Sequence, residues 1–145
     1  TGRPPEINLE DEKLCQEIIR NSINKDFVVS CHDISDGGLS VALAECSILS
    51  GLGAQINIGE NMREDKLLFG EGGSRIIFSI DIHKKENWLK YLNKVNDKFQ
   101  DKLFIKKLGV VSNDKLKIKN FKKVICDLKV SALADKFNNG MIKNF

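Results

Sequence analysis

The amino-acid sequence predicts an α/β (α+β) domain in which a mixed β-sheet has helices packed mainly on one face. Two observations lead to this class. Short apolar or β-branched runs, among them residues 27–31 and 76–80, alternate along the chain with longer segments of helical spacing. In addition, the expected elements follow the order α-β-α-β-β-α-β-β-β-α, in which the helices are too few and too irregularly placed for a doubly wound parallel sheet.

The composition is that of one globular domain. The 145 residues are 41% hydrophobic and 30% charged, which suits a single core. The net charge of +3 is scattered and interleaved with acids, so we expect no nucleic-acid partner. The four cysteines form no Cys-x-x-Cys pair and there are only two histidines, too few ligands for a His/Cys metal centre. The thiols point to a reducing compartment, and the sequence shows no signal peptide and no apolar run long enough to span a membrane. We therefore expect a cytoplasmic location and no membrane partner.

The N-terminal segment is expected to be a linker followed by a helix. Residues 1–8 contain a Pro-Pro pair and lack an initiator methionine, so we expect them to connect an upstream domain to a single domain over residues 9–145. Asn8 is suited to cap a helix whose first turn is acidic. The apolar face of this helix comprises Leu14, Cys15, Ile18, Ile19 and Ile23.

A strand, an acidic turn and a helix between residues 27 and 51 form the central element of the chain. The strand ends in the turn His32-Asp33-Ile34-Ser35-Asp36-Gly37-Gly38, and Gly51 ends the helix. The N–H groups of a helix start attract anions, and carboxylates at the same place suit a Mg²⁺ ion that bridges to a phosphate. Alternatively, Ser35 or Asp36 only caps the helix and the glycines only close the turn. The apolar residues at helical spacing are Leu39, Ala42, Leu43, Cys46 and Leu49.

A glycine-rich loop precedes the next clear strand. Residues 53–58 alternate as a strand, residues 61–68 end in a short helix, and the loop Gly70-Glu71-Gly72-Gly73-Ser74-Arg75 leads into the strand at 76–80. These glycines do not form a dinucleotide-binding fingerprint, because they open a strand rather than a helix. The loop is suited to present N–H groups and a guanidinium to a phosphate or to a partner surface. A hinge with a surface ion pair is the alternative.

Two helices and three strands are expected in the C-terminal part. Residues 84–100 form the clearest amphipathic helix. Residues 104–111 are strand-like, Asn113-Asp114 is a turn, and residues 115–119 alternate as a hairpin partner. A short apolar run at 124–126 precedes a helix at 131–138 that ends at Gly140. The residues expected in the core are Trp88, Leu92, Val95 and Phe99 of the first helix and Leu133, Ala134 and Phe137 of the second.

Four stretches in the first 80 residues carry a resemblance to a known family. They are Gly2-Arg3-Pro4-Pro5-Glu6, the segment from His32 to Glu45, Gly51-Leu52-Gly53-Ala54, and the segment from Leu68 to Arg75. The second is similar to the pattern H-D-x-S/A-D/E-G-G-L-x-V-A-L-A-E of the phosphoribosylformylglycinamidine synthases, in the aminoimidazole ribonucleotide (AIR) synthetase-like superfamily. The chain thus resembles the C-terminal domain of these synthases, which implies an AIR synthase C-terminal-domain-like fold. The last 60 residues show only a compatible pattern.

The resemblance implies a role in de novo purine biosynthesis. Enzymes of this family are ATP-dependent C–N ligases that convert formylglycinamide ribonucleotide, ATP and glutamine-derived ammonia to formylglycinamidine ribonucleotide, ADP and phosphate. The implied cofactors are ATP or ADP and Mg²⁺. The implied partners are upstream domains of the same polypeptide, a glutaminase subunit and a small accessory subunit. The family's catalytic histidines and principal ATP-binding residues lie in domains outside this chain, so we expect no catalytic residue here and an isolated chain that is inert.

Residues of the central turn match the family's auxiliary nucleotide site. The resemblance implies that Asp33 binds the metal and Ser35 the nucleotide, with Asp36, Gly37 and Gly38 as the nucleotide-binding turn. A purely structural role for Asp33 and Ser35 is the alternative. Two other functions remain open for the chain: the C-terminal domain of another ATP-dependent superfamily member, of the AIR synthetase or selenophosphate synthetase type, and a non-catalytic assembly domain whose glycine loops contact a partner subunit.

Overall fold

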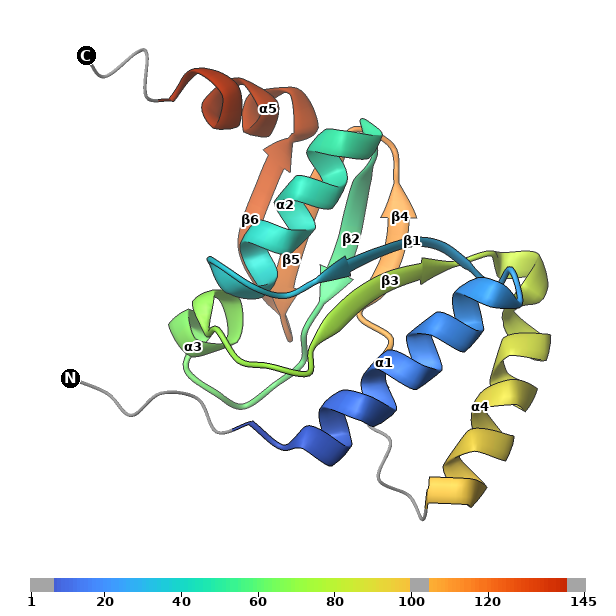
Figure 1. Cartoon of the computed structure of the whole chain (residues 1–145). Coiled ribbons are helices and arrows are strands. Elements are labelled where there is room, and N and C mark those ends of the chain that lie inside the picture. The colour runs from blue at the N-terminus through green and yellow to red at the C-terminus, as the bar shows by residue number, and fades with distance from the viewer. Residues whose placement is uncertain (1–6, 100–104, 141–145) are drawn as a thin grey trace. The chain divides into compact units, whose positions relative to one another are not determined.

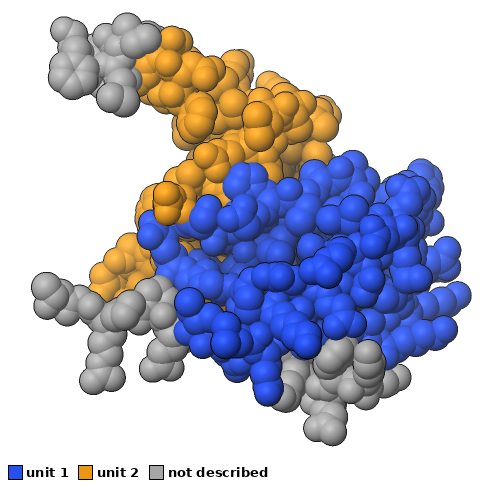
Figure 2. Space-filling view, in the orientation of Figure 1, with its two compact units in different colours: residues 1–35, 71–106 blue, residues 36–70, 107–145 orange. Residues whose placement is uncertain are grey.

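A computed structural model of the chain describes residues 7–99, apart from the side chains of 97–99, and residues 105–140. The chain divides into two compact units: residues 1–35 with 71–106 form unit 1, and residues 36–70 with 107–145 form unit 2 (Figure 2). Both units combine helices and strands, so the predicted α/β class is confirmed. The strands form a two-stranded and a four-stranded sheet, whereas the sequence predicted one mixed sheet. Among the described residues, no helix has the length and apolar character needed to span a membrane.

Unit 1 is a two-stranded antiparallel sheet packed against two helices (Figure 1). It comprises α1 (Leu9–Asn24), β1 (Val28–Asp33), β3 (Ile76–Ile80), the 3₁₀ turn η1 (Ile82–Lys84) and α4 (Lys85–Phe99). The strands pair from Val28↔Ile80 to Asp33↔Ile76, with an irregularity between Val28 and Ser30. Apolar side chains from both helices and from β3 therefore share one core. Its buried members are Leu14, Ile18, Trp88 and Leu92, against which Phe27, Phe78, Ile80, Tyr91 and Val95 pack.

Local sequence signals account for the start of α1, whereas the residue that it buries in its last turn differs from the predicted one. The Asn8 side chain accepts hydrogen bonds from the N–H groups of Glu10 at 3.0 Å and Asp11 at 3.3 Å, which confirms the predicted cap. The acidic first turn complements the positive end of the helix dipole. In the last turn Ile23 is 47% exposed, and Ser22, which is fully buried, occupies the inward position.

Ser22 is buried next to Trp88, where its hydroxyl accepts a hydrogen bond from the indole N–H. Trp88 is buried, and its Nε1–H donates to Ser22 Oγ at 3.4 Å. The Phe78 ring meets the indole edge-on, with ring centroids 5.6 Å apart. The helix around Trp88 is thus confirmed as a core helix. Its predicted end at Gln100 and the side chain of Phe99 lie outside the described residues.

Unit 2 is a four-stranded mixed sheet with α2 lying against one face (Figure 1). The strand order is β4-β2-β5-β6, in which β2 and β5 are parallel and the other pairs antiparallel. Its elements are α2 (Gly38–Ser50), β2 (Gly53–Asn57), α3 (Glu64–Phe69), β4 (Gly109–Ser112), β5 (Lys115–Asn120), β6 (Lys123–Lys129) and α5 (Val130–Asn139). Its buried apolar residues are Leu39, Ala42, Leu43, Ile56, Ile58, Leu68, Leu116, Ile118 and Val130.

The predicted hairpin between residues 104–111 and 115–119 is wrong. β4 begins only at Gly109, Phe104 lies outside the described residues, and β2 is inserted between β4 and β5 with hydrogen bonds to both. The two-residue connection 113–114 therefore crosses the start of β2, where Gly53 N–H donates to Asn113 O at 2.8 Å. A Cβ atom on Gly53 would overlap the backbone of Lys115, so only glycine fits at this crossing.

Two residues of the predicted apolar helix faces lie at the surface of unit 2. Leu49, in the last turn of α2, is 82% exposed, and Phe137, in α5, is 63% exposed. Both helices end as predicted, at Gly51 with a left-handed φ of 71° and at Gly140. Helical spacing identifies an apolar face but does not say how far along the helix that face is covered. The last buried residue along α2 is Ser47. In α5 the first residue, Val130, is buried and the residues after it are not.

A buried asparagine ties β5 to the segment after β2. Asn120 Oδ1 accepts from Glu60 N–H and Asn120 Nδ2 donates to Glu60 O, both at 3.0 Å. We expect Asn120→Asp to lower the free energy of unfolding by about 2 kcal/mol, because a carboxylate has no hydrogen to donate and would face the Glu60 carbonyl while buried. Urea denaturation of the chain measures this. Asn57→Asp, the same change at an exposed position, is the control, and equal losses in the two variants would contradict the assignment.

Candidate functional site

The turn after β1 stands at the surface of unit 1, with the glycine-rich loop beside it. Asp33 is the last residue of β1 and pairs with Ile76. One step further, Ile34 N–H donates to Arg75 O at 2.9 Å, so the ladder continues into the loop of residues 70–75. The Asp33 side chain is 75% exposed, and Ser35 is exposed as well. Two predicted site segments that lie 40 residues apart in sequence are therefore neighbours within unit 1, and Asp33 and Ser35 are accessible to a ligand.

A histidine flanks the Asp33 carboxylate. His32 Nδ1 lies 2.6 Å from Asp33 O and 3.7 Å from Asp33 Oδ1. Since a carbonyl oxygen can only accept, Nδ1 carries the proton in this contact. The ring is thereby oriented along the backbone of the turn. When protonated, it places a positive charge next to the carboxylate.

The hydroxyl of Ser74 is engaged within unit 1. Ser74 Oγ donates to Glu12 Oε2 at 2.7 Å, and Gln16 Nε2 donates to Glu12 Oε1 at 2.7 Å. These two hydrogen bonds, the one from Ser74 first, lower the pKa of Glu12. Arg75 Nε donates to Gly72 O at the long distance of 3.5 Å. In the predicted phosphate or partner loop, Ser74 thus holds the loop to α1, while Glu71 and Gly73 are exposed.

The remaining predicted residues of the turn belong to unit 2. Asp36 is exposed, and Gly37 is the N-cap of α2 with a left-handed φ of 77° and no side-chain cap. The alternative in which Ser35 or Asp36 caps this helix is therefore wrong. Gly38, with a φ of 69°, allows close packing on α3, because an added Cβ would lie 2.7 Å from Leu68 O.

The side chains around the turn after β1 suit a metal ion that takes a single ligand from the protein. Among the described residues, no group of three His, Cys, Asp or Glu side chains is placed to hold a metal ion. A closed structural site of the zinc type is thus excluded for this part of the chain. Mg²⁺ at a nucleotide is bound differently, through one or two carboxylates together with phosphate oxygens and water. The exposed carboxylate of Asp33 fits such an ion as a single protein ligand.

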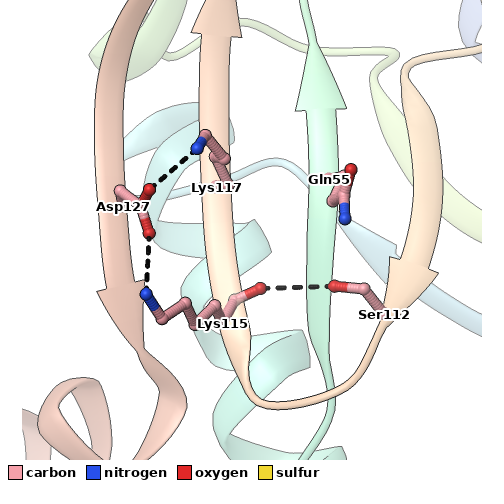
Figure 3. Close-up of a pocket in the computed structure, with 5 residues that line it drawn as sticks. All are labelled: Gln55, Ser112, Lys115, Lys117 and Asp127. Atoms are coloured by element: carbon pink, nitrogen blue, oxygen red, sulfur yellow. Dashed lines mark hydrogen bonds and ion pairs between the residues drawn. The ribbon is translucent and has the colours of Figure 1, made fainter.

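Unit 2 contains a pocket that was not predicted from the sequence. It has a volume of about 200 Å³ and is lined by residues of β2, β4, β5 and β6 (Figure 3). Asp127 accepts from Lys117 at 2.9 Å and lies 3.6 Å from Lys115, and the hydrogen bond from Lys117 lowers the pKa of Asp127. Both ammonium groups thus share one carboxylate on the sheet. The lining residues are Gln55, Ser112, Lys115, Lys117 and Asp127. No local pattern signals this pocket, because it depends on the strand order.

The sequence of the chain matches a known family and relatives within it. The family described as "AIR synthase related protein, C-terminal domain" matches residues 1–115. Phosphoribosylformylglycinamidine synthase subunit PurL of Prochlorococcus marinus (strain MIT 9312) is 55% identical over 142 residues, which are 97% of this chain and 18% of that protein. The PurL subunit of strain AS9601 is 52% identical over 146 residues, 100% of this chain and 19% of that protein. The chain thus spans about a fifth of the length of these relatives.

Solved structures share the fold. A structure titled "T. maritima PurL complexed with ATP" superposes with a TM-score of 0.69 at 19% sequence identity, over 84% of this chain and 21% of that one. A second, titled "T. maritima PurL complexed with FGAR", gives a TM-score of 0.70 at 19% identity over 85% of this chain and 21% of that one. The family match over residues 1–115 and this shared fold lead to one conclusion. The chain belongs to the AIR synthase related protein family, and the region matched is the family's C-terminal domain.

Proposed function

We propose that the chain is the C-terminal domain of a phosphoribosylformylglycinamidine synthase, the ATP-dependent ligase that forms formylglycinamidine ribonucleotide from formylglycinamide ribonucleotide and glutamine-derived ammonia. The observation that carries the proposal is the 55% identity over 97% of the chain to a PurL subunit. In this proposal residues 1–8 connect an upstream domain to one functional domain, residues 9–145, which comprises unit 2 and all of unit 1 beyond residue 8. The enzyme is cytoplasmic, and its partners are its own upstream domains, a glutaminase subunit and a small accessory subunit.

The proposed role of this domain is to supply part of an auxiliary nucleotide site. Asp33 provides a carboxylate oxygen to Mg²⁺, and Ser35 provides a hydroxyl to the nucleotide phosphates. Asp36, Gly37 and Gly38 follow in sequence as the turn that brings the chain into α2. Two features support this: the side chain of Asp33 is 75% exposed, and the titles of related structures name ATP, ADP and AMPPCP as bound molecules.

The chemistry of this domain is binding and orientation. Mg²⁺, when bound, would neutralise charge on the nucleotide phosphates. Asp33 would hold the ion at the end of β1, where pairing with Ile76 fixes the backbone. The backbone of Arg75 lies beside this turn, because its carbonyl oxygen accepts from Ile34 N–H. Because no proton-transferring residue is assigned to this domain, the isolated chain is expected to be inactive.

Removing the carboxylate of Asp33 tests the proposal. We expect Asp33→Ala in the full-length protein to retain about tenfold less ADP after purification, because the metal loses its protein ligand. The melting temperature should fall in parallel, since a retained nucleotide stabilises the folded state, and turnover should fall less. Bound nucleotide is measured by chromatography of the denatured protein, and stability by calorimetry.

Two further variants separate the possible results. Asp33→Asn keeps an oxygen acceptor without the charge and should also lose nucleotide if a metal is held there. Asp114→Ala removes an exposed carboxylate of unit 2 and should retain ADP at the wild-type level. Undiminished ADP in Asp33→Ala would refute the assignment and would favour a structural role for the acidic turn.

A further inference from the structure

We infer that Glu12 is a positioning residue for the glycine-rich loop of residues 70–75. In this inference the Glu12 carboxylate fixes the backbone of Ser74 and so places Arg75 beside the turn after β1. This goes beyond the role of Glu12 in the acidic first turn of α1, where any carboxylate would serve the helix dipole. The inference rests on the proposed function in one respect, namely that the ligand of this surface is a nucleotide phosphate.

Each carboxylate oxygen of Glu12 accepts a hydrogen bond from a different side chain. Oε2 accepts from Ser74 Oγ at 2.7 Å, and Oε1 accepts from Gln16 Nε2 at 2.7 Å. Gln16 lies one turn further along the same helix, so its amide holds the Glu12 carboxylate in the orientation that meets Ser74. The hydrogen bonds also lower the pKa of Glu12, which keeps the group ionised and the bond to Ser74 charge-assisted at neutral pH.

The Ser74 backbone needs such an anchor. Its φ is +59°, a left-handed conformation that residues with a Cβ atom adopt only when their surroundings hold them there. The preceding residues, Gly72 and Gly73, have no side chains that restrict the loop, and a Cβ on Gly73 would meet nothing within 4 Å. The hydrogen bond to Glu12 is a contact that can hold Ser74 in this conformation.

The conformation of Ser74 determines where the next residue lies. Arg75 follows directly, and its carbonyl oxygen accepts from Ile34 N–H at 2.9 Å. Ile34 stands between Asp33 and Ser35, the residues proposed to bind metal and nucleotide. If Ser74 changed to a negative φ while Ile76 stayed paired with Asp33, the backbone between Gly72 and Arg75 would have to shift. The Gly72 carbonyl that accepts from Arg75 Nε would then move. Glu12 thus acts on the proposed site through two residues and without touching a ligand.

Hydrogen exchange and nucleotide binding in the full-length protein test this inference. For Glu12→Ala we expect amide exchange in residues 70–75 to be at least about tenfold faster and affinity for ADP with Mg²⁺ to be about tenfold weaker. Glu12→Gln should lie between wild type and Glu12→Ala, because its amide oxygen still accepts from Ser74 without the charge. Asp11→Ala, which removes an exposed carboxylate from the same turn, should behave as wild type in both measurements.

Ser74→Gly provides a second and independent variant. Glycine adopts a positive φ without an anchor, so in this background Glu12→Ala should have little further effect on exchange or on ADP affinity. Equal effects of Glu12→Ala with Ser74 and with Gly at position 74, or unchanged exchange in Glu12→Ala, would overturn the inference. If the wild-type protein binds no ADP, the proposed function fails. The exchange measurements then still decide whether Glu12 positions the loop.

Discussion

Gly53→Ala is expected to lower the free energy of unfolding by about 4 kcal/mol, the largest effect among the substitutions considered. The added Cβ atom would overlap the backbone oxygen, carbon and nitrogen of Lys115, none of which can move aside as a flexible side chain would. Gly53 is also hydrogen-bonded to Asn113 at 2.8 Å, so the connection between β4 and β5 would have to leave β2 to relieve the overlap. Equilibrium urea denaturation of the chain measures the loss.

Gly73→Ala is the matched control for this prediction. A Cβ on Gly73 would meet no atom within 4 Å, and the residue has no positive φ, so the same change should alter stability by no more than about 0.5 kcal/mol. If Gly53→Ala were as stable as Gly73→Ala, the crossing of residues 113–114 over the start of β2 would be disproved. β4 and β5 would then have to be arranged differently, for instance as the hairpin that the sequence suggests.

The failure of the hairpin prediction shows what local patterns lack. Residues 109–112 and 115–120 are strands, within or close to the predicted ranges 104–111 and 115–119, and two residues connect them. Nothing in these twelve residues shows that another strand lies between the two. The strand order depends on Gly53, more than 50 residues earlier, because the absence of a side chain there lets the connection between β4 and β5 pass close to β2. Strand propensity thus predicts which residues are extended, whereas strand order depends on such close approaches between distant segments.

The sequence predicts the end of a helix correctly where a contact between neighbouring residues determines that end. Asn8 caps α1 through hydrogen bonds to residues two and three positions on, and Gly51 ends α2 because it takes the left-handed conformation. Both are interactions within a single turn of chain. Ser22 was missed for the opposite reason: its partner, Trp88, is 66 residues away on another helix. A serine at an inward helix position carries no sign of that partner.

In the candidate site, too, the sequence predicts the local element but not the contacts between distant residues. The motif from His32 to Gly38 predicted an acidic turn between a strand and a helix, and the structure has one there. The approach of residues 70–75 to this turn was not predicted, because it requires the pairing of β1 with β3. Glu12 belongs to the acidic first turn of α1, and nothing in that pattern distinguishes it from Glu10 and Asp11. Its bond to Ser74 joins residues 62 positions apart and could be found only in three dimensions.

The second large effect is expected at Gly38, where the proposed nucleotide turn meets the core of unit 2. Gly38→Ala should lower the free energy of unfolding by about 3 kcal/mol, because two penalties add. The left-handed φ of 69° is unfavourable for alanine, and the new Cβ would lie 2.7 Å from Leu68 O and 2.8 Å from Phe69 Cα. Both neighbours are backbone atoms at the end of α3. Urea denaturation monitored by circular dichroism measures the change.

Gly37→Ala separates the two penalties. Gly37 has a similar left-handed φ of 77°, but the three atoms nearest to its added Cβ all belong to the side chain of Val41. Truncation in the double variant Gly37→Ala/Val41→Ala should therefore remove the overlap with the Val41 methyl groups. It should leave the backbone strain of about 1–2 kcal/mol and the 2.9 Å contact with the Cβ of residue 41, beyond the cost of Val41→Ala alone. No truncation can rescue Gly38→Ala in this way, because side-chain removal does not move the α3 backbone. Equal losses for Gly37→Ala and Gly38→Ala, both fully relieved by Val41→Ala, would show that α2 does not begin against the end of α3.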